Sequence, residues 1–141
     1  MTTKAIIFDK DGTLLDFDSF WVTVSEYAIK EILDTVKMQD IPVEEILSAL
    51  GVKNNITDIN GILCHGTYAQ MAQVIYDILK KYGCDCTLDE IEKLTIETYH
   101  KNADKGIVKG TCDNICDVAF CFPYSYGFCC YSLCSFSFFK L

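Results

Sequence analysis

The sequence predicts an α/β fold in which one short strand and its loop belong to a core, while most of the remaining chain forms helices. Lys4 to Phe8 is a short apolar run typical of a strand buried in a parallel sheet, and the polar loop Asp9-Lys10-Asp11-Gly12-Thr13 follows it directly. Helical periodicity and capping signals then continue to about residue 105. A turn at Ile107 to Thr111 and the start of a fifth helix near Cys112 to Val118 follow, and the composition changes near Asp117, so we expect the core to be incomplete.

Four helices are predicted after the loop, from apolar residues at helical spacing and from start or stop signals. Two of them begin with a Thr followed three residues later by Gln or Glu, the capping-box spacing in which side chains satisfy backbone donors reciprocally. Another begins at a proline, which is favoured in a first helical turn. The predicted spans are about Ser19 to Met38, Pro42 to Gly51, Thr67 to Gly83 and Thr87 to residue 105.

The charge balance argues against a nucleic-acid partner. The chain has 12 basic residues, all of them lysines, and 20 acidic residues, which gives a net charge of -8. Nucleic-acid binding needs clustered positive charge that displaces counterions from phosphates. We also expect a cytoplasmic protein with reduced cysteines, because the first residues run directly into the apolar strand without the features of a signal peptide.

The last part of the chain differs in composition from the rest. From Val118 to Leu141 the only charged residue is Lys140, and aromatic residues and cysteines are frequent. The uncharged stretch is long enough to cross a bilayer, but Pro123 and Gly127 make it a poor helix, so no membrane anchor is expected. The cysteine spacings match no zinc-binding pattern. The composition favours a frameshifted or otherwise truncated copy, with an evolved tail as the alternative.

The loop after the strand carries the candidate chemistry. Asp9 and Asp11 lie two residues apart at the carboxyl end of the strand, so both side chains can point into one pocket. Two converging carboxylates repel each other unless a cation lies between them, and such hard oxygen ligands suit Mg²⁺. Gly12 allows the backbone to approach a phosphate closely, and Thr13 adds a hydroxyl. An EF-hand calcium loop is excluded, because its glycine and glutamate positions are not matched here.

At residues 6–16 the chain resembles the haloacid-dehalogenase-like hydrolase superfamily, whose first motif is an apolar strand followed by Asp-x-Asp-Gly-Thr. The resemblance implies that Asp9 is the nucleophile that forms an aspartyl-phosphate and binds Mg²⁺. It implies that Asp11 acts as general acid and then base, and also reaches Mg²⁺ through its backbone carbonyl. Dehalogenase members lack the second Asp and need no metal, so Asp11 indicates a phosphotransfer enzyme.

The resemblance also implies a domain organisation similar to that of phosphoglycolate-phosphatase-like members. Residues 1–16 would be the first strand and catalytic loop of a Rossmann-like core, residues 17–105 an inserted α-helical cap, and residues 106–118 the return to the core. Residues 119–141 are an atypical tail rich in cysteine and aromatic residues. The family's later motifs, which are a Ser or Thr after the second strand, a downstream Lys and a late acidic pair, have no counterpart in this sequence.

We therefore expect a Mg²⁺-dependent phosphatase that hydrolyses a small phosphorylated metabolite through an aspartyl-phosphate, with the activity of this chain impaired by the loss of the later motifs. One alternative is a phosphoglucomutase-type phosphotransferase that returns the phosphoryl group to a sugar. Another is a non-catalytic binding fragment built on the cap. The sequence identifies neither the substrate nor the oligomeric state, because selectivity lies in the cap and in the loops that face the active site.

Three further residues carry weaker signals. His65 lies in the loop before the third predicted helix, where it could contact a substrate's leaving group. A plain loop histidine is the better interpretation, because nothing nearby in the sequence provides a partner. Cys84 and Cys86 are too closely spaced for a C-x-x-C zinc knuckle, so we interpret them as loop and core thiols.

Overall fold

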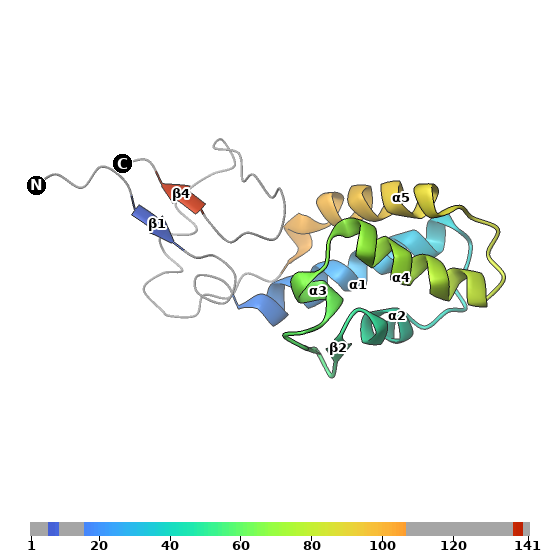
Figure 1. The fold of residues 1–141 in the computed structure, drawn as a ribbon, viewed down its shortest axis with the longest axis horizontal. Coiled ribbons are helices and arrows are strands. Elements are labelled where there is room, and N and C mark those ends of the chain that lie inside the picture. Colours follow the sequence, from blue (N-terminus) through green and yellow to red (C-terminus); the bar gives the residue numbers. More distant parts are fainter. Residues whose placement is uncertain (1–5, 9–15, 107–136, 140–141) are drawn as a thin grey trace, which may run out of the picture.

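The computed structural model describes residues 6–8, 16–106 and 137–139 (Figure 1). The long continuous stretch forms a helical body, defined here as residues 16–106. Its elements in chain order are α1 (Phe17–Thr35), α2 (Val43–Ala49), β2 (Val52–Lys53), β3 (Ile56–Thr57), α3 (Ile62–His65), α4 (Tyr68–Lys81), α5 (Leu88–Lys101) and the short 3-10 helix η1 (Ala103–Lys105). Outside the body, β1 (Ile6–Phe8) and β4 (Ser137–Phe139) are described as strands.

The described residues form a mixed α/β structure that is mostly helical, with β1 and β4 paired in a two-stranded sheet. A strand was predicted at Lys4 to Phe8, and the described part of it is β1, Ile6–Phe8, but its partner differs from the expectation. β1 pairs antiparallel with β4, with Ile7 opposite Phe138, whereas a parallel neighbour was expected. An apolar run favours strand formation but does not encode the direction of its neighbour, which depends on the segment that comes alongside. The Rossmann-like core therefore remains a prediction.

Local hydrogen bonds determine where the first long helix, α1, begins and ends. Asp16 is the N-cap of α1, and its carboxylate accepts a hydrogen bond from the Ser19 N–H at 2.7 Å. This cap explains why α1 begins two residues before the predicted start. At the other end Lys37 adopts a left-handed conformation with φ of 59°, and the Met38 N–H donates to the Leu33 carbonyl at 2.9 Å. This Schellman-type closure ends α1 before the predicted Met38.

Both predicted capping boxes are confirmed. In α4 the Thr67 hydroxyl accepts from the Gln70 N–H at 3.3 Å, and the Gln70 side chain accepts from the Thr67 N–H at 2.9 Å. In α5 Thr87 and Glu90 make the same reciprocal pair, at 3.3 and 2.8 Å. Each box satisfies two of the backbone donors that a helix N-terminus leaves without intrahelical partners.

The segment between α2 and α4 contains elements that the sequence signals did not predict. Pro42 is the N-cap of α2 and not its first helical residue, and the helix ends at Ala49. β2 and β3 then form a hairpin whose turn residues, Asn54 and Asn55, have φ of 52° and 60°. Two consecutive left-handed residues are characteristic of a tight type I′ turn, for which asparagine is well suited. The short helix α3 follows the hairpin.

One hydrophobic core holds the helical body together. α5 packs against both α1 and α4, and α2 packs against α1 and α4 as well. The buried apolar residues that form this core are Val22, Val24, Ala28, Ile29, Ile32, Leu33, Ile41, Ile46, Leu47, Leu50, Val52, Leu63, Met71, Ala72, Ile75, Leu79, Cys84, Ile91 and Tyr99.

No helix in the described part of the chain is long and apolar enough to cross a membrane.

Candidate functional site

The four predicted site residues, Asp9, Asp11, Gly12 and Thr13, lie outside the described residues. Their flanking elements are described. β1 ends at Phe8, immediately before Asp9, and α1 is capped by Asp16 directly after the loop. The aspartate loop, residues 9–15, thus joins the end of a strand to the first helix of the body.

The chain enters and leaves the helical body at the same end (Figure 1). η1 packs against α1, and it is followed by Gly106, the last residue of the body. A Cβ atom built at Gly106 would lie 2.4 Å from the ring of Phe20, so a larger residue would require this ring of α1 to move. Asp16 lies one turn before Phe20 on the same helix. The first and last residues of the body therefore lie at the same end, next to the aspartate loop.

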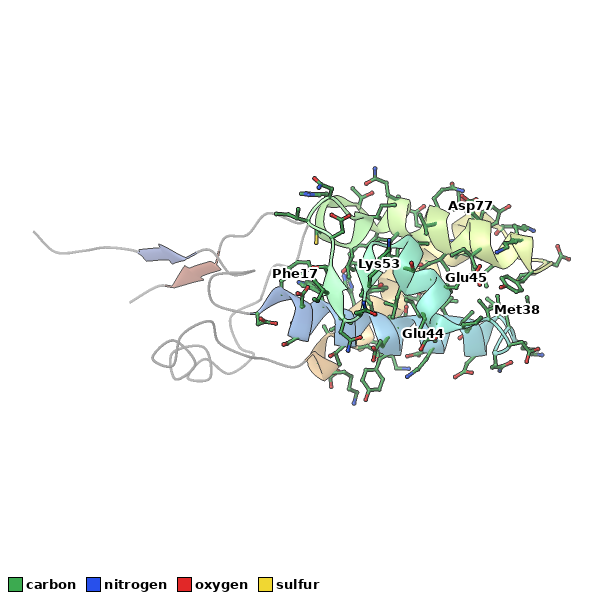
Figure 2. The ribbon with its side chains drawn as sticks, turned by 90° about the horizontal axis from the view of Figure 1, so that it is seen from below. Phe17, Met38, Glu44, Glu45, Lys53 and Asp77 are labelled. Carbon is green, nitrogen blue, oxygen red and sulfur yellow. The ribbon has the colours of Figure 1, made fainter. Side chains whose placement is uncertain are left out.

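Aromatic side chains gather on the first turns of α1, at this end of the body. Trp21 contacts Phe20 edge-on with ring centroids 5.2 Å apart, and the Phe17 ring centroid lies 6.3 Å from that of Trp21. All three side chains are half-buried. Figure 2 shows Phe17 at one end of the body and Met38 at the other. The end next to the aspartate loop thus presents a partly apolar, aromatic surface.

A pair of hydrogen bonds fixes the hairpin to the start of α1. One carboxylate oxygen of Asp18 accepts both from the Thr57 N–H at 2.9 Å and from the Thr57 hydroxyl at 2.5 Å. An acidic side chain in the first turn of a helix is also stabilised by the positive end of the helix dipole. The hairpin is therefore held at the same end of α1 as the aromatic side chains.

A hollow of about 390 Å³ lies between the end of α2 and the hairpin. The hairpin lies within residues 51–61, and the two ends of this segment are in close backbone contact. A Cβ atom at Gly51 would lie 2.7 Å from the Cα of Gly61. The lining of the hollow includes two hydroxyls, one ammonium group (Lys53, Figure 2) and one carboxylate, but most of its exposed surface is apolar. Its lining residues are Ser48, Gly51, Lys53, Ile56, Thr57 and Asp58.

Two carboxylates with lowered pKa in the body join neighbouring helices, and a third, Glu90, belongs to the capping box of α5. Glu31 has its pKa lowered first by the hydrogen bond from Lys101 and then by that from Asn102, which join α1 to α5. Glu45 has its pKa lowered by hydrogen bonds from Lys81 and Tyr82, which join α2 to the end of α4. These contacts hold helices together, and neither lies at the hollow.

The weaker candidates of the sequence have clear positions. His65 is the last residue of α3 and is exposed, not in the loop where it was expected. Cys84 is buried in the core and Cys86 is half-buried against it, as expected of core and loop thiols. Within residues 16–106 no three His, Cys, Asp or Glu side chains are grouped to hold a metal ion.

Comparisons of the chain with protein-family models, with curated proteins and with solved structures found no match. The contact that sequence reasoning missed at this end of the body is the one between Asp18 and Thr57. The hairpin that carries Thr57 had a turn signal in the sequence, because Asn54-Asn55 lies between the short segments Val52-Lys53 and Ile56-Thr57. The partner of Thr57, in contrast, lies 39 residues away and has no local signal.

Proposed function

We propose that the chain carries the catalytic loop of a Mg²⁺-dependent phosphomonoester hydrolase of the haloacid-dehalogenase-like type, acting on a small phosphorylated metabolite. The observation that carries this proposal is the apolar strand followed by Asp9-Lys10-Asp11-Gly12-Thr13. That β1 ends at Phe8 supports it, because the nucleophile of such a loop must directly follow a strand. Catalytic side chains at the carboxyl end of a strand can converge on a ligand outside the sheet.

The reaction divides one phosphoryl transfer into two easier steps. The Asp9 carboxylate attacks phosphorus, the bond between phosphorus and the leaving oxygen breaks, and Asp11 gives that oxygen a proton. Asp11 then accepts a proton from the water that attacks the aspartyl-phosphate. The bond between phosphorus and Asp9 breaks, phosphate is released, and the Asp9 carboxylate is restored. Gly12 and Thr13 would bind phosphoryl oxygens through a backbone N–H and a hydroxyl.

The metal expectation rests on the donor chemistry of the loop. Asp9 and Asp11 provide hard carboxylate and carbonyl oxygens, which Mg²⁺ prefers. When bound, Mg²⁺ would supply positive charge that offsets the repulsion between the nucleophile and the phosphate. The two Asp side chains fit such an ion, and Asp9 and Asp11 are the residues that would hold it.

The shape of the helical body supports its assignment as a cap. An inserted cap must leave and rejoin the core at neighbouring points, and the contact between Gly106 and Phe20 brings the two ends of the body together. The aromatic cluster of α1 and the hairpin held by Asp18 lie at this end, where they could face a substrate at the aspartate loop. Residues 17–105 would then restrict the substrate, while Asp9 and Asp11 carry out the chemistry.

Trapping the covalent intermediate tests the nucleophile without requiring fast turnover. The chain is incubated with acetyl phosphate and Mg²⁺, reduced with borohydride, and digested with trypsin. Borohydride converts an aspartyl-phosphate to homoserine. The peptide of residues 5–10 contains Asp9 as its only acidic side chain, so conversion there is assigned without ambiguity. We expect conversion at Asp9 that disappears when a chelator removes Mg²⁺.

Two variants complete the test. Asp9→Asn should abolish the conversion, because an amide cannot attack phosphorus, while Asp40→Asn, an exposed position in the link between α1 and α2, should leave it unchanged. Conversion spread over many acidic residues, or conversion that persists in Asp9→Asn, would refute the nucleophile assignment. Conversion that is equal without Mg²⁺ would refute the metal-assisted reaction.

A non-catalytic binding role is the second candidate, favoured by the hollow next to the hairpin, whose lining includes the Lys53 ammonium group. It predicts that a small phosphorylated compound shifts the NMR signals of Lys53 and Thr57 while no aspartyl-phosphate forms. A phosphotransferase would instead interconvert sugar phosphates without releasing phosphate.

A further inference from the structure

The turn that follows the hairpin places an exposed asparagine directly before a glycine. In residues 58–61 the Gly61 N–H donates to the Asp58 carbonyl at 2.7 Å, and the Asn60 N–H donates to the Asp58 carboxylate at 2.9 Å. Asn60 is exposed, and its side-chain amide makes no hydrogen bond with any residue that the structure describes. It is also the only asparagine of the sequence that is followed by glycine. The Asn60 amide can therefore approach the backbone nitrogen of the next residue.

Packing explains why a glycine follows Asn60. A Cβ atom at Gly61 would lie 2.9 Å from the Asp58 carbonyl oxygen and 3.0 Å from the Cα of Gly51. These neighbours are backbone atoms, so they cannot turn aside as the end of a side chain can. Glycine also leaves its own backbone nitrogen more open to approach than any other residue does, because it has no Cβ. The fold thus keeps an accessible backbone nitrogen next to an exposed amide.

The other asparagines of the helical body lack this combination. Asn54 and Asn55 are exposed, but each is followed by a residue with a side chain that hinders access to its N–H. The hindrance is greatest at Ile56, which is branched at Cβ. Asn102 is 7% exposed, and its amide donates to the Glu31 carboxylate and to a backbone carbonyl at 2.9 Å each. Asn60 therefore differs from the others in both accessibility and neighbour.

We propose that Asn60 is a modification site, at which the side-chain amide is lost and an aspartate or isoaspartate forms without an enzyme or cofactor. The Gly61 nitrogen gives up its proton and attacks the carbonyl carbon of the Asn60 side chain. A new carbon–nitrogen bond forms, the bond to the side-chain nitrogen breaks, and ammonia leaves with the proton. Water then adds to one of the two carbonyls of the resulting succinimide and opens the ring. Attack at one carbonyl gives aspartate, and attack at the other gives isoaspartate.

The hydrogen bond from Gly61 to Asp58 slows this reaction by a limited amount. The N–H must leave the carbonyl before its nitrogen can attack, so the turn has to open. Residues 58–60 are exposed, so water can replace the lost partner and the core is not disturbed. The net contribution of one such bond corresponds to a factor of about two to ten, and we expect the folded chain to react more slowly than the urea-unfolded chain by about that factor.

The isoaspartate product would alter the hairpin segment, residues 51–61. Its main chain runs through the former side chain and is longer by one methylene group. The two ends of this segment are in close backbone contact at Gly51 and Gly61, so the added length has to be taken up between them. Thr57 lies in the same segment and is bonded to Asp18 at the start of α1. The modification should therefore shift the NMR signals of Thr57.

Peptide mapping of the full chain tests the proposal. The chain is incubated at neutral pH, folded or in urea, and samples taken over time are digested with trypsin beside an unincubated sample. Residues 54–80 form one peptide that contains Asn54, Asn55 and Asn60, so the three positions are compared within a single molecule. Fragmentation locates the mass gained when an acid replaces an amide. An isoaspartyl methyltransferase with a labelled methyl donor distinguishes isoaspartate from aspartate. We expect conversion predominantly at position 60, with isoaspartate among its products.

Two variants complete the test. Asn60→Gln keeps an amide but would require a larger ring, so it should lose both the conversion and the methyl label at position 60. Asn55→Asp removes a neighbouring amide and, like asparagine, tolerates the left-handed backbone of the hairpin turn, so conversion at Asn60 should be unchanged. Circular dichroism checks that both variants keep their helices. The proposal is wrong if positions 54 and 55 convert as fast as position 60, or if Asn60 converts in urea but stays intact in the folded chain.

Discussion

The helical body and the β1–β4 pair differ in how their residues find their partners. In the body, the α-helices surround a core of nineteen buried apolar residues, and α1, α4 and α5 begin or end at side-chain or Schellman-type caps made within a few residues. In the pair, two strands of three residues each come from opposite ends of the chain. We therefore expect the helical body to be stabilised by contacts within one continuous segment, while the strand that precedes the aspartate loop depends on a partner distant in the sequence.

The largest effect is expected from a cavity in the body. Ile75 is fully buried on α4, so Ile75→Ala should lower the free energy of unfolding by about 2–5 kcal/mol. Phe138→Pro, which removes a hydrogen-bond donor from β4, should leave the helical transition unchanged. Urea unfolding followed by the helical circular dichroism signal measures both. Equal losses from the two variants would mean that the strands and the body unfold as one unit.

Alkaline pH should weaken the body through one buried tyrosine. Burial raises the pKa of Tyr99, whose hydroxyl has no hydrogen-bond partner among the described residues. The folded state therefore keeps a proton that the unfolded state releases, so this contribution is present below the unfolded pKa and is lost as pH rises above it. With an unfolded pKa near 10, the loss by about pH 11 is about 1.4 kcal/mol.

The tyrosine effect can be isolated by substitution. Tyr99→Phe should be as stable as the wild-type chain near neutral pH and should lose less stability under alkaline conditions. Tyr27→Phe is the matched control, because Tyr27 lies on α1 and is 48% exposed. Unfolding curves near neutral and at alkaline pH compare the variants. If Tyr99→Phe lost as much free energy of unfolding at alkaline pH as the wild-type chain, the loss would not be caused by Tyr99.

The capping boxes should contribute intermediate amounts. Thr67→Ala and Thr87→Ala should each lower the free energy of unfolding by about 1 kcal/mol, because each variant leaves a helical N–H without its partner. Thr35→Ala is the control, since its exposed hydroxyl only donates to a carbonyl in the last turn of α1. Thermal unfolding of the three variants under one condition provides the comparison. If Thr35→Ala lowered the free energy of unfolding as much as the other two variants, the capping hydroxyls would contribute no more to stability than an exposed hydroxyl that does not cap a helix.

The smallest effect is expected from the surface contact between α1 and α5. Lys101 and Asn102 lower the pKa of Glu31, so the contact is present above the unfolded pKa of Glu31 and is lost as pH falls through its folded pKa. Both charged side chains are partly exposed to solvent, which weakens the contact. Lys101→Met should therefore cause a slight loss near neutral pH that disappears in acid. Urea unfolding at the two pH values measures it, and a loss that persists in acid would point to packing of the lysine stem instead of the ion pair.

The parts of the fold that could be predicted are those with local physical causes. Thr67 with Gln70 and Thr87 with Glu90 meet within one helical turn, so their sequence spacing alone identifies them. The start of α1 was misplaced by two residues, because the capping by Asp16 was not recognised. The hairpin was missed although Asn54-Asn55 is a turn signal, because two-residue strands leave almost no alternation to detect.

Contacts between distant residues could not be predicted from the pattern. The antiparallel direction of β1 is set by β4, and no property of the run from Lys4 to Phe8 encodes it. Gly106 contacts Phe20, but the two residues lie far apart in the sequence, and no local pattern indicates that they meet. The same limit applies to the candidate site. The residues of the aspartate loop could be identified from their chemistry and order. The distances between them depend on neighbouring segments that local sequence signals do not specify.

The most direct test of this account is to express residues 16–106 alone and to compare their unfolding with that of the full chain. If the body is a closed unit whose ends meet at Phe20 and Gly106, the fragment should keep its helical circular dichroism signal. It should also unfold in one cooperative urea transition, with a free energy within about 0.5 kcal/mol of that of the full chain. A fragment that loses its helices or unfolds without cooperativity would contradict the account and would show that the aspartate loop and the strands are needed to hold the body together.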